Sequence, residues 1–76
     1  MEVKIKGIYK HYKGDLYIVE DIATHSDTFE KMVVYRGLYA DAPLWIKPYD
    51  AFFDEVNQNG QQYRFELKTI LSVRKD

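Results

Sequence analysis

The chain has 76 residues, 16% of them aromatic, no cysteine and a formal net charge of −1. This length allows one small domain, residues 1–76, and excludes a second hydrophobic core. The absence of cysteine excludes disulfides and thiolate metal sites, and the net charge argues against a broadly basic nucleic-acid-binding surface. We therefore expect a core filled by aromatic side chains, each of which removes roughly 150–250 Å² from water when buried.

The first six residues alternate between apolar and charged side chains, without the apolar run of a signal peptide. No apolar run in the sequence approaches the about 20 residues of a membrane-spanning helix. We therefore expect a cytoplasmic protein with no membrane partner. His11 and His25 alone cannot complete a metal site, and the glycines are too far apart for a phosphate-binding loop, so we expect neither a metal nor a cofactor.

The N-terminal half predicts two antiparallel strands. Residues 7–12 alternate in polarity and are rich in β-branched and aromatic side chains, as strands are. Gly14 favours a turn over 13–15 because glycine takes a positive φ without steric cost, and residues 16–23 predict the returning strand. Residues 24–28 form a polar loop by composition. We expect the lysines of residues 1–14 and the acidic side chains of residues 15–30 to offset one another.

The second half predicts three further strands and one helical turn. Residues 31–39 are the strongest strand and are expected to be central, and residues 44–47 form a short strand that Pro48 ends because it lacks an N–H. Helical spacing of apolar residues predicts one turn near 49–52. Asn59-Gly60 predicts a hairpin between 53–57 and 61–67. In residues 68–76 the alternation of apolar and polar residues fits a strand, whereas the spacing of the apolar residues fits a helix, and both interpretations stay open.

About five short strands and a single helical turn predict an all-β domain. The expected architecture is a small SH3-like β-barrel, with an OB-like barrel as the alternative. Closing the sheet would hide the edges that otherwise invite aggregation.

Several motifs, in order, resemble a bacterial family of unknown function, DUF1653. They are Lys10-His11-Tyr12-Lys13-Gly14, Ala23-Thr24-His25-Ser26-Asp27-Thr28, Val33-Val34-Tyr35-Arg36-Gly37-Leu38-Tyr39, Trp45-Ile46-Lys47-Pro48, Ala51-Phe52 and Arg64-Phe65. The resemblance covers residues 7–66, with 67–76 as a tail. The sequence departs from the family pattern at four positions, where Lys10 and Lys47 replace arginine, Asp27 replaces glutamate and Ala51 replaces methionine. The resemblance implies a bacterial cytosolic setting and supplies no activity.

Arg36 is the only charged residue between Val33 and Ala40. If it is buried, it must form a clamp with a carboxylate, because an unpaired buried charge is very costly. If it is exposed, it can join a recognition patch of aromatic and basic side chains. The candidate binding residues are His11, Tyr35, Arg36, Tyr39, Trp45, Lys47 and Arg64, and we expect Arg36 and Arg64 to share one face.

Aromatic and arginine side chains are enriched at binding hot spots, and aromatic rings also stack on single-stranded nucleic acid. The sequence therefore favours a non-catalytic binding module that recognises a peptide, a protein surface or single-stranded nucleic acid. Trp45 is then either a core anchor or a platform for the ligand. The alternative is a small enzyme or a regulatory ligand-binding domain that uses His11 with a nearby carboxylate.

Overall fold

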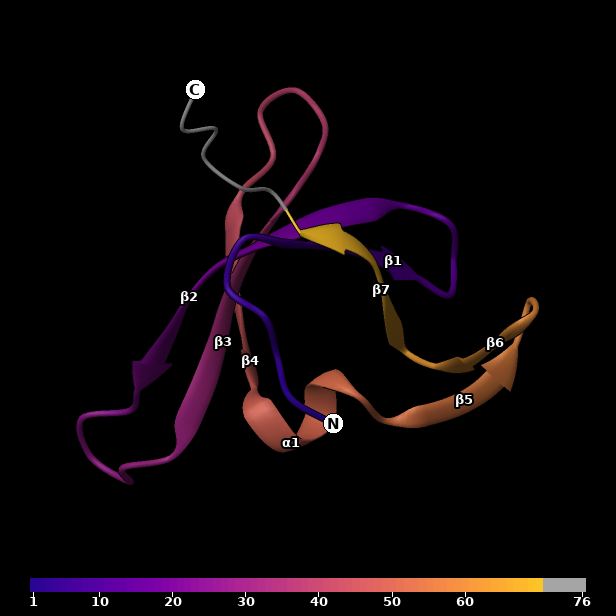
Figure 1. Cartoon of the computed structure of the whole chain (residues 1–76). Helices are drawn as coiled ribbons and strands as arrows, with labels where there is room; N and C mark the ends of the chain where they lie inside the picture. Colours follow the sequence, from indigo (N-terminus) through magenta and orange to yellow (C-terminus); the bar gives the residue numbers. More distant parts are fainter. Residues whose placement is uncertain (71–76) are drawn as a thin grey trace, which may run out of the picture.

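A computed structural model describes residues 1–70, which fold mainly into antiparallel β-structure (Figure 1). The elements in chain order are β1 (Gly7–His11), β2 (Leu16–Thr24), β3 (Lys31–Gly37), β4 (Leu44–Pro48), α1 (Tyr49–Phe52), β5 (Glu55–Gln58), β6 (Gln61–Tyr63) and β7 (Phe65–Ile70). Five strands form one sheet in the order β4-β3-β2-β1-β7, and β5 pairs with β6 in a separate hairpin. No helix within residues 1–70 is long and apolar enough to cross a membrane.

The prediction of a mainly β-fold with a helical turn near 49–52 is confirmed. The expected closure into a barrel is wrong, because β4 and β7 lie at opposite edges of the five-stranded sheet and do not pair with each other. The sheet instead curls, and α1 and the N-terminal segment occupy its open side (Figure 1). Side chains from these segments fill the space that a closed barrel would enclose.

The chain changes partner strands at Arg64. The sequence predicts one hairpin strand over 61–67, but β6 pairs with β5 whereas β7 pairs with β1. The Arg64 N–H donates to the Asp54 carbonyl at 2.7 Å, and the Arg64 carbonyl accepts from the Tyr12 N–H at 3.0 Å. These two bonds mark the junction between the hairpin and the sheet. Beyond it the chain is a strand through Ile70, and the remainder of the ambiguous tail lies outside the described residues.

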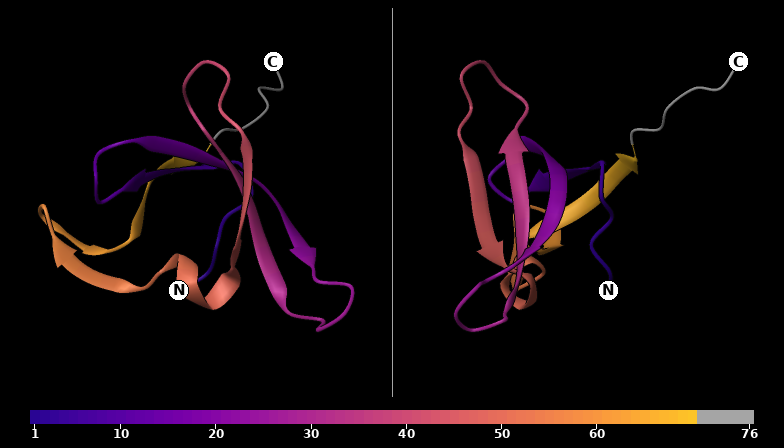
Figure 2. Two further views of the ribbon diagram at one scale, coloured as in Figure 1. Left: turned by 180° about the vertical axis from the view of Figure 1, so that it is seen from behind. Right: turned by 90° about the vertical axis from the view of Figure 1, so that its left-hand side faces the viewer.

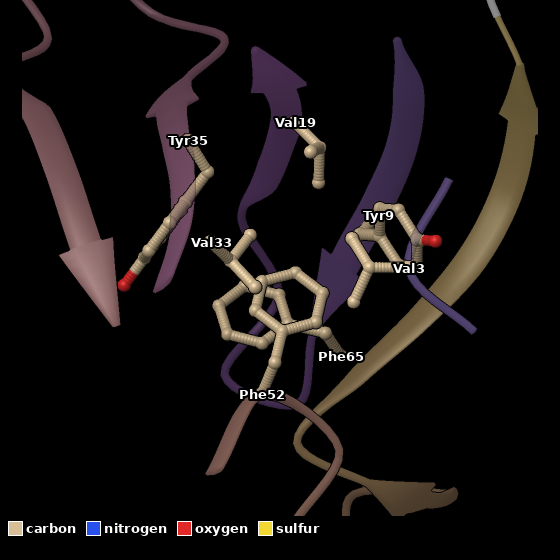
Figure 3. Close-up of a cluster of buried hydrophobic side chains, with 7 residues drawn as sticks. All are labelled: Val3, Tyr9, Val19, Val33, Tyr35, Phe52 and Phe65. Carbon is tan, nitrogen blue, oxygen red and sulfur yellow. The ribbon is translucent and has the colours of Figure 1, made fainter. Parts of the chain in front are cut away.

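An aromatic stack forms the centre of the core. The rings of Phe52 from α1 and Phe65 from β7 are parallel to within 2°, with centroids 4.2 Å apart. Tyr9 and Tyr35 meet Phe52 edge-on at 5.2 and 5.7 Å, and Figure 3 shows these rings together with Val3, Val19 and Val33. We call the side of the sheet that faces this stack the inner face. The core is built largely from aromatic side chains, as the composition predicts.

Two tyrosine hydroxyls hold the N-terminal segment against the core. The Val3 N–H donates to Tyr49 Oη, and the Lys4 N–H donates to Tyr9 Oη, each at 2.9 Å. Val3 is buried, so this segment contributes a side chain to the core as well as covering it. Burial raises the pKa of Tyr9, so its hydroxyl remains protonated over the physiological range.

A β-bulge at Glu20 creates an ion-pair network on the outer face of the sheet. Val19 lies opposite Tyr35 and Asp21 lies opposite Val34, so Glu20 is the extra residue in β2. Its carboxylate bonds Lys6 Nζ at 3.1 Å and Arg36 Nε at 3.3 Å. The hydrogen bond from Lys6, and then that from Arg36, lower the pKa of Glu20. The Lys6 contact confirms, for this pair, the expected offset between the basic and acidic segments.

The edge strand β4 is rich in exposed apolar side chains. Leu44, Trp45 and Ile46 are 52%, 45% and 62% exposed, and the right-hand view of Figure 2 shows β4 at the outer edge of the sheet. Trp45 is therefore not a core anchor, and that alternative is wrong.

We predict a large difference between Phe65→Ala and Trp45→Ala in the free energy of unfolding. Phe65 is fully buried in the stack, so truncation should cost about 3–5 kcal/mol. Trp45 is half-exposed at the sheet edge, so its truncation should cost about 1 kcal/mol or less. Urea denaturation followed by far-UV circular dichroism measures both. Equal losses for the two variants would contradict the core described above.

We predict that Glu20→Gln lowers stability by about 1 kcal/mol or less at neutral pH, because exposed ion pairs contribute little. The folded-state pKa of Glu20 is lowered, so its contribution is present above the pKa of the unfolded chain and is lost as the pH falls through the folded-state pKa. Urea denaturation at neutral and acidic pH should show that the stability difference between the wild-type chain and Glu20→Gln disappears in acid. The exposed Glu30→Gln is the matched control, and a Glu20→Gln effect that persists in acid would count against the ion-pair explanation.

Candidate functional site

The β3–β4 hairpin places the aromatic side chain of Trp45 and the basic side chain of Lys47 next to core residues of β3. Tyr35 lies directly opposite Trp45, and Val33 lies opposite Lys47. Residues opposite each other in antiparallel strands project to the same face of the sheet. Because Val33 and Tyr35 belong to the core cluster, Trp45 and Lys47 also extend from the inner face.

Tyr39 joins this group by folding back over Gly37. A Cβ at Gly37 would lie 2.0 Å from the Tyr39 ring, so any other residue at this position would displace the ring. Gly37 is opposite Tyr17 in the sheet, and the Tyr17 ring meets Tyr35 edge-on at 5.6 Å. Tyr39 is half-exposed, whereas Tyr35 is only 8% exposed. Tyr39 can therefore offer a ring face to a ligand, and its neighbour Tyr17 packs on Tyr35 of the core.

Arg64 carries a positive charge beside these rings. Its Nη2 donates to Asp54 Oδ2 in a long contact of 3.4 Å, and its Nε is buried with no hydrogen-bond partner within residues 1–70. Burial raises the pKa of Tyr35 and the neighbouring Tyr17 raises it further, while the charge of Arg64 opposes the rise. Arg64 is thus close enough to the Tyr35 hydroxyl to act on it electrostatically.

His11 packs its ring against the aromatic core. It meets Phe65 edge-on at 4.9 Å and Tyr17 at 6.2 Å. Its Nδ1 accepts a hydrogen bond from the Lys13 N–H at 3.1 Å, so the neutral ring carries its proton on Nε2.

The environment of His11 favours the neutral ring. Burial lowers the pKa of His11 below its ordinary value. Three neighbouring cations, Arg64, Lys13 and Lys47, lower it further, and Asp15 opposes them. His11 is therefore mainly uncharged at neutral pH and becomes an additional cation only below the ordinary range for histidine.

The structure brings six of the seven predicted binding residues to the inner face. We call this group the inner-face site, and its members are His11, Tyr35, Tyr39, Trp45, Lys47 and Arg64.

Arg36 is the exception. Neighbouring strand residues point to opposite faces, so Arg36 lies on the outer face while Tyr35 points to the core, and the expectation that Arg36 and Arg64 share a face is wrong. Arg36 also donates to the Ala42 carbonyl at 3.4 Å. Its side chain is 44% exposed and that of Glu20 is 29% exposed. The pair is an ion pair near the surface rather than a buried clamp.

Sequence reasoning does not select Tyr17, which supports both His11 and Tyr35. The signal that identifies it is the hairpin register, since Tyr9 lies opposite Tyr17. His25 has a different role, because its Nδ1 accepts from the N–H groups of Asp27 and Thr28 at 3.1 and 3.3 Å. It organises the loop between β2 and β3. Within residues 1–70, no three acidic or histidine side chains cluster as metal ligands would.

Comparison with known proteins supports the resemblance of the sequence motifs. The profile of a family described as a protein of unknown function, DUF1653, matches residues 7–67. The crystal structure of a DUF1653 protein from Bordetella bronchiseptica is similar, with 32% sequence identity and a TM-score of 0.75 over 91% of this chain and 92% of that chain. No curated protein matches the sequence significantly. With a profile that spans most of its length and a related structure of the same fold, the chain belongs to the DUF1653 family.

Proposed function

We propose that this chain is a non-catalytic binding module whose inner-face site holds a short single-stranded nucleic acid segment. One observation carries the proposal: the half-exposed rings of Tyr39 and Trp45 project from the same hairpin face as Lys47, and Arg64 acts on Tyr35 of that face. Proteins bind single-stranded nucleic acids with aromatic side chains next to cations. The bases stack on the aromatic rings, and the cations attract the negatively charged phosphates.

The electrostatics of the inner-face site favour an anionic ligand. The charges acting on His11 come mainly from Arg64, Lys13 and Lys47. The end of the Arg64 guanidinium keeps donor capacity, because the contact from its Nη2 to Asp54 Oδ2 is long at 3.4 Å. With a formal net charge of −1 for the whole chain, the attraction is local, so we expect a short binding segment and moderate affinity. A peptide ligand would have to carry acidic side chains and an aromatic ring.

The enzymatic alternative requires a hydrogen bond between His11 and a carboxylate. Within residues 1–70 the His11 side chain takes its hydrogen bond from the Lys13 N–H instead. The surrounding cations also lower the fraction of His11 that could donate a proton at neutral pH. No observation therefore favours catalysis by His11, and the binding module is the function that we propose.

Trp45 is the only tryptophan, so its fluorescence reports directly on the inner-face site. We predict that an oligonucleotide of about six bases quenches this fluorescence and shifts the amide resonances of Tyr39, Lys47 and Arg64 together. Tyr39→Ala should weaken binding about 5- to 150-fold, because stacking of one base contributes about 1–3 kcal/mol.

Lys47→Ala and Arg36→Ala form a matched pair for the same titration, since each removes one positive charge. Loss of Lys47 should weaken binding, whereas loss of Arg36 on the outer face should leave it unchanged. With two phosphate contacts, the logarithm of the affinity should fall with that of the salt concentration at a slope of about −1.4. The proposal fails if resonance shifts gather outside the inner-face site, or if an acidic peptide binds there and oligonucleotides do not.

We predict that oligonucleotide affinity increases as the pH falls below neutrality. The pKa of His11 is lowered by burial and by its neighbouring cations, so the ring gains its charge only below the ordinary range for histidine. That added charge attracts phosphate. The measurement is fluorescence titration from neutral to mildly acidic pH. His11→Gln should remove the increase and His25→Gln should retain it, because His25 lies in the loop between β2 and β3. The same pH dependence in both variants would rule out His11 as the titrating group.

A further inference from the structure

A cavity of about 360 Å³ lies between the N-terminal segment, the end of α1 and the start of β7. The residues that determine its chemistry are four aromatic side chains and two carboxylates: Tyr9, Phe53, Tyr63, Phe65, Glu2 and Glu66. Its volume falls within the range of about 300–1,000 Å³ that is typical of small-molecule sites. It shares no residue with the inner-face site, and the two meet at Phe65, which lines the cavity and also packs against His11 with ring centroids 4.9 Å apart.

The shape of the cavity is fixed by contacts on each side. On one side, the hydrogen bonds from the Val3 and Lys4 N–H groups to tyrosine hydroxyls hold the N-terminal segment in place. On the other side, Phe53 packs on Phe52 with centroids 5.3 Å apart and lies 6.1 Å from Tyr9. Tyr9, Phe53 and Phe65 therefore belong to the packed core, and Tyr63 adds a half-buried ring from β6.

The charges around the cavity are negative. Among the described residues, no lysine, arginine or histidine lines it. Lys4 Nζ does pair with Glu2 Oε1 at 3.1 Å, but both side chains are well exposed. Glu66 is held by two backbone donors, since its Oε2 accepts from the N–H groups of Gln62 and Tyr63 at 2.9 and 3.2 Å. No hydrogen bond to its Oε1 is formed within residues 1–70, so the carboxylate has an oxygen that is not engaged by the protein.

An apolar cavity with aromatic rings and one carboxylate held by backbone donors, that of Glu66, selects a particular kind of ligand. Anions are repelled by Glu2 and Glu66, and a small hydrated cation would lose its water to apolar walls without enough oxygen ligands to replace it. A quaternary ammonium group avoids both problems. Its methyl surface is apolar, its charge is spread, and the faces of aromatic rings attract it.

We propose that this cavity binds a trimethylammonium group. The methyl groups pack against Phe53 and Tyr63, and the positive charge lies within range of the Glu66 carboxylate. This inference is independent of nucleic-acid binding, because it uses a different set of side chains. The group could be supplied by a free metabolite of the choline type or by a trimethylated lysine side chain, and the experiment separates these sources.

The test uses the full chain and two probes of the same shape. Choline carries the trimethylammonium charge, and 3,3-dimethyl-1-butanol replaces the charged nitrogen with neutral carbon. Choline should shift the amide resonances of Phe53, Tyr63, Glu66 and Leu67 in a saturable titration. The neutral alcohol should bind at least about tenfold more weakly, because it lacks the attraction to ring faces and carboxylate.

Two variants examine the cavity walls. Glu66→Gln keeps a side-chain oxygen to accept from the Gln62 and Tyr63 N–H groups but removes the charge, and it should weaken choline binding about fivefold or more. Tyr63→Leu should do the same by removing a ring. Glu55→Gln is the matched control: Glu55 bonds the Gln62 side chain at 2.8 Å on the same hairpin but does not line the cavity, so choline binding should be retained. Amide spectra without ligand establish that each variant is folded.

Equal binding of choline and its neutral isostere would overturn the proposal, as would the absence of shifts at these residues at millimolar choline. Unchanged binding in folded Glu66→Gln would also overturn it. A short peptide with a trimethyllysine identifies the source: tighter binding than choline supports a modified protein as the partner, and equal or weaker binding supports a free metabolite. Because these resonances differ from those of Tyr39, Lys47 and Arg64, failure here is distinguishable from failure of nucleic-acid binding.

Discussion

The stack of Phe52 on Phe65 holds the open sheet in its curled shape. Phe52 follows β4, which is one edge of the sheet, and Phe65 begins β7, which is the other edge. A closed barrel would join these edges through backbone hydrogen bonds. Here two parallel rings 4.2 Å apart join them through side chains. The two edges are therefore connected by apolar packing, which tolerates small rotations better than a hydrogen-bonded ladder does.

The same ring of Phe65 supports two surfaces of opposite charge. It packs against His11, Tyr17 and Tyr35 with centroids 4.9 to 5.5 Å away, close to the positive charge of Arg64. The ring also lines the cavity, to whose wall Glu66 contributes. Arg64 and Glu66 are its immediate neighbours in the chain, so a short length of backbone distributes the opposite charges around one buried ring.

Local patterns predict the elements well and their assembly less well. Alternating polarity, Gly14 and Pro48 are local signals, and they locate the first hairpin, β4 and the helical turn correctly. Barrel closure depends on whether the two edges meet, which is a long-range property that no local pattern encodes. Arg36 illustrates a related ambiguity, since Val33 and Tyr35 on one face of β3 are as apolar as Met32 and Val34 on the other. The positions of Phe52 and Phe65 decide which face of β3 is the inner one. They therefore also decide that Arg36 lies on the outer face. The cavity has no counterpart in the sequence patterns because its walls come from the N-terminus, α1 and the β6–β7 region.

The exposed edge of β4 also constrains how this chain behaves when it is crowded. Leu44, Trp45 and Ile46 present apolar side chains on a strand whose outer edge has no partner strand among residues 1–70, and such edges can template fibril growth. Pro43 precedes this segment and Pro48 ends it. Neither proline can donate a backbone hydrogen bond, so an incoming strand finds only a short ladder between them. The two prolines act as gatekeeper residues, because they limit the number of residues of this edge that can pair with another strand in a fibril.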